Sequence, residues 1–162
     1  MKKFIIAGLS ALLLVGCGVP NEKKETQPVK EEQVVNASDE SVTPFPDGAI
    51  PIGEGKVKVI TPNGTSEDGK IPTVFVKKDA LIQQLELELA DFQNDKETFV
   101  FVDNIFEDKH HVTRMTQTTV ELKQKTLETG QHTVTAVQFE NNDPAGKVIN
   151  FVQAKFENKP AQ

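Results

Sequence analysis

The sequence predicts an all-β domain, and three features indicate it: short runs of β-forming residues, the spacing of these runs, and the turn residues between them. The runs are rich in Val, Phe and Thr, which strands favour. They recur about every ten residues, separated by Gly, Pro, Asn and Asp, which favour turns. Short strands at this spacing are typical of a β-sandwich or a β-barrel.

The predicted strands follow one another from residue 57 onward. The first alternates apolar and polar side chains and ends at the turn Pro62-Asn63-Gly64. Further turn signals lie at residues 94–95, 129–130 and 141–146. The segments with this pattern are residues 57–61, 72–76, 98–102, 116–123, 133–139 and 147–156.

Residues 80–92 fit two structures. Leu85 and Leu89 lie at helical spacing, and Asp79 could cap a helix that starts there. Leu85, Leu87 and Leu89 also alternate with glutamates, which is strand spacing. Helix propensity favours the first structure. The neighbouring strands need a partner, and this context favours a strand.

The N-terminus has the pattern of a secretion signal. Lys2 and Lys3 form a short positive region, and residues 4–15 form an apolar run. The run is shorter than the roughly 20 apolar residues of a spanning helix. Leu-Val-Gly-Cys at residues 14–17 resembles the lipobox of bacterial lipoproteins. The resemblance implies that residues 1–16 are a signal peptide and that the Cys17 sulfur receives diacylglycerol. An uncleaved anchor and an unmodified thiol are the alternatives.

Residues 17–54 are predicted to form a lipidated, disordered tether. They are polar, charged and rich in Pro, without sustained periodicity. Such a segment cannot bury enough apolar area to offset the entropy lost on ordering. The folded domain is then expected at residues 55–158, followed by a disordered tail at residues 159–162.

Two parts of the predicted domain resemble bacterial immunoglobulin-like domains. Residues 130–136, with Gly146 and residues 154–156, are similar to the last two strands of that family, and residues 97–103 are similar to its third. The resemblance implies an immunoglobulin-like β-sandwich of about seven strands that serves as a spacer or binding module at the cell surface. His132 stands where the family usually has an aromatic residue, often Tyr. Its imidazole could still donate a proton to a nearby carbonyl.

The sequence contains no recognisable catalytic or metal-binding motif. It has no phosphate-binding loop, dinucleotide fingerprint or nucleophile elbow. His110 and His111 are adjacent, so on a strand they face opposite sides. The carboxylates of Glu86 and Glu88 are expected to solvate an exposed face. We therefore expect a non-enzymatic protein with no metal site and no cofactor.

The last two strands carry apolar residues where side chains should face solvent. If Val134 and Ala136 point to the core, alternate neighbours point outward. The third strand is apolar on both faces, so either Phe99 and Phe101 or Val100 and Val102 also point outward. An exposed patch of this kind marks a binding surface. A shifted register or a covering segment is the alternative. The candidate binding residues are Phe99, Phe101, Val137, Phe139, Ile149 and Phe151.

Net charge and composition limit the classes of molecule that the protein is expected to bind. Lys2 and Lys3 leave with the signal, so 16 of the 18 basic residues face 24 acidic ones. This balance disfavours nucleic acid. The leading hypothesis is a lipid-anchored interaction domain at the extracytoplasmic face of the cell membrane, on a Gram-positive surface, that binds membrane lipid through Cys17 and recognises a surface protein. Alternatives are a phage-exclusion or conjugation-related envelope lipoprotein, and a glycan- or ion-capturing module. The absence of Trp and Tyr disfavours the glycan module.

Overall fold

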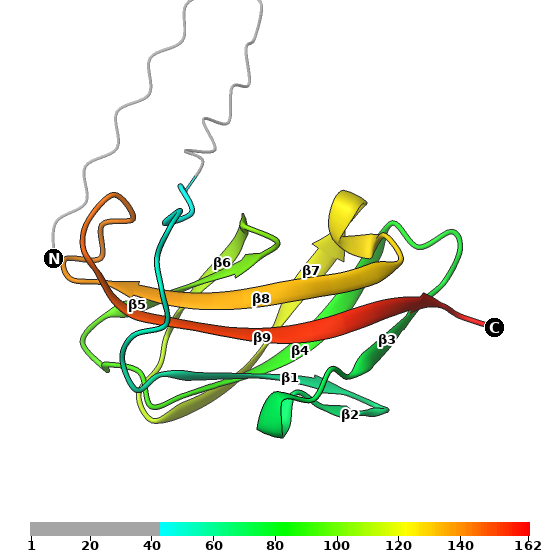
Figure 1. Ribbon diagram of the computed structural model, residues 1–162, viewed down its shortest axis with the longest axis horizontal. Coiled ribbons are helices and arrows are strands. Elements are labelled where there is room, and N and C mark those ends of the chain that lie inside the picture. The colour runs from blue at the N-terminus through cyan, green and yellow to red at the C-terminus, as the bar shows by residue number, and fades with distance from the viewer. Residues whose placement is uncertain (1–42) are drawn as a thin grey trace, which may run out of the picture. The chain divides into compact units, whose positions relative to one another are not determined.

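The computed structural model describes residues 43–162 (Figure 1). They form nine β-strands, which are arranged in two sheets, and two short 3-10 helices. Cys17, the expected signal peptide and the expected tether up to residue 42 lie outside the described residues. One sheet has the order β2-β1-β4-β7 and the other β3-β9-β8-β5-β6. The four-stranded sheet contains β2 (Gly64–Thr65), β1 (Lys56–Thr61), β4 (Ile82–Ala90) and β7 (Met115–Lys123). The five-stranded sheet contains β3 (Thr73–Val76), β9 (Val148–Pro160), β8 (Gly130–Phe139), β5 (Glu97–Val102) and β6 (Ile105–His111). The 3-10 helices are η1 (Glu67–Gly69) and η2 (Gln124–Leu127).

The predicted fold class, an all-β sandwich of immunoglobulin-like type, is confirmed. β1, β4 and β7 are neighbours in one sheet, and β5, β8 and β9 are neighbours in the other, as in that architecture. The count is nine strands instead of about seven, because β2 and β6 were not expected. β2 has two residues, and β6 is a charged edge strand without an alternating pattern. Asp103 and Asn104 connect β5 to β6, and their positive φ angles of 48° and 67° suit a tight hairpin.

The ambiguous segment is a strand. β4 pairs antiparallel with β1 on one side and with β7 on the other. As a strand it provides hydrogen-bond partners for the backbone of both neighbours, which a helix could not do. Leu85, Leu87 and Leu89 point into the core, whereas Glu86 and Glu88 alternate with them on the outer side. The Lys58 ammonium lies 2.6 Å from the carboxylate of Glu88 across this outer face.

The core between the sheets settles which face of β5 points inward. Val100 and Val102 belong to the main hydrophobic core together with residues of β4, β8 and β9. Phe99 and Phe101 therefore lie on the opposite, outer face. A bulge between Gln138 and Phe139 places Phe139 opposite Val148. Because a bulge inserts one residue, it reverses the side on which later side chains emerge. Val148 therefore packs on the outer face, although simple alternation with the core-facing Val152 and Ala154 would point it inward.

His132 occupies a corner between η2 and β8. Its Nε2 lies 2.8 Å from the backbone oxygen of Glu128, and its Nδ1 lies 2.5 Å from a carboxylate oxygen of Asp103. The ring stacks on Phe156 at a centroid distance of 5.2 Å. The imidazole thus reaches an upstream backbone carbonyl, as the phenol of a tyrosine corner does.

A buried polar network, built on Gln138 and Asn150, closes the end of the sandwich at which β1 begins. The Gln138 Oε1 accepts hydrogen bonds from the Asn150 side chain at 2.8 Å and from the backbone N–H of Gln93 at 3.0 Å. The Asn150 Oδ1 accepts from the backbone N–H of Gly55 at 3.1 Å. A Cβ added at Gly53 would lie 1.8 Å from that oxygen, so this close approach requires glycine.

Candidate functional site

Five of the six candidate binding residues come together on the outer face of the five-stranded sheet. We call Phe99, Phe101, Val137, Phe139 and Phe151 the outer aromatic cluster. All five side chains are buried. Ile149, the sixth candidate, is partly buried and does not join the cluster.

The segment of residues 43–52, which we call the strap, covers this cluster. Figure 1 shows it crossing in front of β8 and β9. The Phe45 ring meets those of Phe101 and Phe151 edge-on, at centroid distances of 5.3 and 6.1 Å. Ile52 and Phe151 exchange two backbone hydrogen bonds, of 2.8 and 3.2 Å. The alternative that another segment covers the apolar face is therefore the one that the structure shows. The covering residues belong to the segment that was predicted to be a disordered tether.

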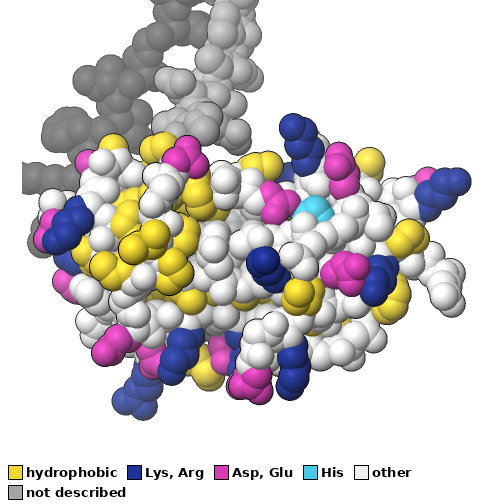
Figure 2. All heavy atoms as spheres, viewed as in Figure 1, with side chains coloured by type: hydrophobic (Ala, Val, Ile, Leu, Met, Phe, Trp, Pro, Cys, Tyr) yellow, Lys and Arg dark blue, Asp and Glu magenta, His cyan; other side chains and the backbone are white. Residues whose placement is uncertain are grey.

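The strap itself presents apolar side chains to solvent. Ile50 is 74% exposed and Ile52 is 52% exposed. Figure 2 shows hydrophobic side chains gathered on this face of the molecule. Beside them lies an open groove of about 470 Å³ between the strap and the β8–β9 loop. Its apolar lining comes from Pro46, Ala49, Ile50, Ile52, Pro144, Ala145 and Val148.

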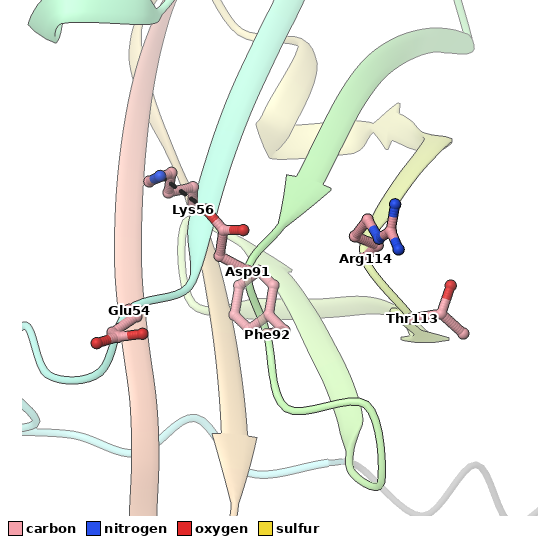
Figure 3. Close-up of a pocket in the computed structure, with 6 residues that line it drawn as sticks. All are labelled: Glu54, Lys56, Asp91, Phe92, Thr113 and Arg114. Atoms are coloured by element: carbon pink, nitrogen blue, oxygen red, sulfur yellow. Dashed lines mark hydrogen bonds and ion pairs between the residues drawn. The ribbon is translucent and has the colours of Figure 1, made fainter.

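A second hollow lies beside the start of β1 and the end of β4 (Figure 3). The ammonium of Lys56 lies 2.7 Å from a carboxylate oxygen of Asp91, and this hydrogen bond raises the pKa of Lys56. Both side chains are exposed, so the pair adds little to stability. Arg114 points away from the ion pair in Figure 3. The residues that line this hollow are Glu54, Lys56, Asp91, Phe92, Thr113 and Arg114.

Glu107 is the one carboxylate with a raised pKa within residues 43–162, and burial is the main cause. Its side chain is 3% exposed and its Oε1 has no hydrogen-bond partner. The Lys123 ammonium is 3.9 Å from Oε2 and lowers the pKa, whereas Glu121 raises it. The carboxylate lies between the edges of β6 and β7, away from both hollows. Its burial without a hydrogen-bond partner for Oε1 is unfavourable for the stability of the fold.

The histidines are dispersed. His110 Nε2 lies 3.4 Å from the Thr118 hydroxyl and 3.6 Å from a carboxylate oxygen of Asp108. His132 is held in its corner. Among residues 43–162, no three His, Cys, Asp or Glu side chains are grouped as a metal ion would require.

Comparison with known proteins adds no relative to these observations. No protein-family model matches the chain, and no curated protein matches its sequence. Within the described part of the chain, no helix has the length and apolar character needed to cross a bilayer.

Sequence reasoning did not identify the strap. Phe45, Ala49, Ile50 and Ile52 stand among prolines and glycines, a context that predicts irregular backbone. The signal that could have found them is their apolar character, which the preceding charged residues lack. The binding role of the outer aromatic cluster stays a prediction, because the strap covers the cluster.

Proposed function

We propose that this protein is a lipid-anchored, non-enzymatic interaction domain that recognises a protein partner at the extracytoplasmic face of the cell membrane. The observation that carries the proposal is the pair of exposed isoleucines, Ile50 and Ile52, beside a groove that is lined by both apolar and polar groups. Large exposed apolar side chains around a groove are typical of a protein-binding surface. The strap–groove surface, defined by the strap and the β8–β9 loop, is the proposed binding site.

The layers below this surface suit such a role. The strap lies on the outer aromatic cluster, whose rings are buried and contact one another edge-on. The cluster in turn rests on a sheet joined by continuous antiparallel pairing between β5, β8 and β9. A partner would therefore meet a short adaptable segment on a rigid support, which is how binding loops are commonly presented.

The anchor rests on residues 1–17 alone. A positive start, an apolar run and a lipobox-like Leu-Val-Gly-Cys together support acylation of Cys17. Two or more acyl chains give stable membrane attachment. Labelled palmitate should enter the wild-type protein and should not enter a Cys17→Ser variant. Equal labelling or equal membrane retention of the two proteins would exclude the anchor.

The binding surface can be tested by photocrosslinking in cells. A photoreactive residue at position 50 should crosslink to a defined protein, and the same residue at position 84 should not. Gln84 is exposed on the outer face of the four-stranded sheet and serves as the matched control. An Ile52→Asp substitution should abolish the crosslink from position 50. The same products from both positions, or a crosslink that Ile52→Asp leaves unchanged, would refute the proposed surface.

A further inference from the structure

β7 forms one edge of the four-stranded sheet, next to β4 (Figure 1). It has nine residues and pairs with β4 along its whole length without a register shift. The other edge strands are short or irregular: β2 has two residues, β3 has four, and the pairing of β6 with β5 contains a bulge. Proteins commonly protect the edges of their sheets by short strands, bulges or prolines, and β7 has none of these three.

Alternate backbone groups of β7 point away from β4 and toward the open edge. The N–H and the carbonyl of Lys123 both bond to the Thr126 hydroxyl in η2, at 2.8 and 2.9 Å, and so point away from β4. Because backbone direction alternates along a strand, the N–H and carbonyl groups of Gln117, Thr119 and Glu121 face the same edge. Among residues 43–162, no other strand and no loop backbone bonds to these groups.

β6 of the other sheet contacts β7 through side chains and leaves the backbone edge open. The His110 ring lies 3.4 Å from the Thr118 hydroxyl, and the Lys123 ammonium lies 3.9 Å from the Glu107 carboxylate. β6 and β7 share no backbone pairing. A further strand can therefore be added beside β7 in the plane of the four-stranded sheet.

We infer that two copies of this protein pair through their β7 edges, in antiparallel orientation, about a two-fold axis at Thr119. Residues 115–123 are centred on this threonine, so this register uses the whole strand. It places Thr119 opposite its own copy and Gln117 opposite Glu121 of the second copy. Both kinds of pair join edge-facing backbone groups, so each pair exchanges both of its backbone hydrogen bonds.

The side chains of β7 favour a second copy as the occupant of this edge. Gln117, Thr119 and Glu121 are exposed. Two threonines are a favourable cross-strand pair, and the Gln117 amide can donate to the carboxylate of Glu121. Each carboxylate thus lies opposite an amide instead of opposite its own copy. Moving the axis to Glu121 would set two carboxylates opposite each other and would bring η2, which follows Lys123, into the interface.

The dimer is expected to be weak in solution. A single pair of strands buries less than the roughly 1,200 Å² of a stable complex. The inference does not require the proposed lipid anchor, although two copies held on one membrane would have a higher effective concentration. The strap lies on the other sheet, so the dimer would present two strap–groove surfaces.

Crosslinking tests which edge is used. Thr119→Cys is introduced into the full-length chain, purified in mild detergent, and treated with a short bifunctional maleimide. Gln84→Cys, on the same exposed face but on the interior strand β4, is the matched control. In the proposed dimer the two copies of position 119 are about 5 Å apart and those of position 84 about 20 Å apart. Position 119 should therefore give a dimer band that position 84 does not, and the parent chain reports any product through Cys17.

Charge substitution at the axis tests the register. Thr119→Lys sets two ammonium groups opposite each other and should weaken the dimer about fivefold in sedimentation equilibrium, and Thr119→Glu should do the same. An equal mixture of the two variants should restore the dimer, because opposite charges then meet. Gln84→Lys adds the same charge away from the axis and should leave the dimer unchanged. Thermal melts verify that each variant is folded.

The remaining outcomes overturn the inference. They are equal crosslinking at both positions, a chain that sediments as a monomer at every concentration, and a mixture of the charged variants that does not dimerise. A dimer that Thr119→Lys leaves intact uses another surface and overturns the inference as well. Ile52→Asp should leave the dimer unchanged, so failure of the β7 pairing and failure of the proposed strap–groove site are separate results.

Discussion

Replacing Phe45 by Ala should release the strap without unfolding the sandwich. The Phe45 ring is half-buried, so the lost burial costs about 1 kcal/mol. Its two edge-on contacts with Phe101 and Phe151 add about 0.5 kcal/mol each. The strap should therefore open more easily by about 2 kcal/mol, which is about thirtyfold in the opening equilibrium.

Amide hydrogen exchange measures this opening directly. Exchange should accelerate at the Ile52 N–H, which donates to the Phe151 carbonyl, whereas the β4 amides should keep their wild-type protection. Ile50→Ala is the matched control, because that side chain is exposed and its loss should change exchange little. Equal acceleration across β4 would mean that the strap is part of the global folding unit. Unchanged exchange at Ile52 would mean that the ring does not hold the strap.

Three further substitutions test other parts of the structure. Burial raises the pKa of the Glu107 carboxyl above its ordinary value of 4.5, so the folded protein binds the carboxyl proton more tightly than the unfolded chain does. The stability of the folded protein therefore falls as the pH rises above 4.5. Glu107→Gln should therefore raise stability by about 1 kcal/mol at about pH 7 and by little at about pH 4 in thermal melts, whereas the exposed Glu86→Gln should do neither. Gly53→Ala should lower the free energy of unfolding, measured in urea, by more than about 2 kcal/mol, because the new Cβ would displace the buried Asn150 amide. Gly48 has a similar positive φ but open space around it, so Gly48→Ala should lower the free energy of unfolding by about 1 kcal/mol. Equal losses for the two substitutions would refute the role of the clash. His132→Phe keeps a ring for stacking but loses both polar contacts, so it should cost about 2 kcal/mol by the same assay, and a neutral result would show that the corner contacts contribute nothing.

The sequence was most informative where one face of a strand is buried. The alternation of Leu85, Leu87 and Leu89 with glutamates identified β4 once its need for partners was considered. The supposition that Val134 and Ala136 face the core, which followed the resembled family, also agrees with the structure. In these cases the two-residue period of a strand fixes the direction of every side chain, so the sequence pattern predicts the structure.

It was least informative where tertiary contacts override the pattern. The bulge at Gln138 reverses Val148, and no local residue type marks that insertion. β6 is a strand because it pairs with β5 at the edge of the sheet, although most of its own residues are polar. The strap is ordered by rings on distant strands, so its contacts could not be read from its own Pro-rich sequence.

The parallel pairing of β3 with the end of β9 has a practical consequence for expressing the domain. β9 extends to Pro160, and the Ala161 N–H still donates to the Val76 carbonyl. A recombinant fragment trimmed to residues 55–158 would lose half of the partners of β3 together with the whole strap. It would present a frayed edge and a bare sheet of phenylalanines, and such surfaces promote aggregation. Cloning limits at residues 43 and 162 keep both covered.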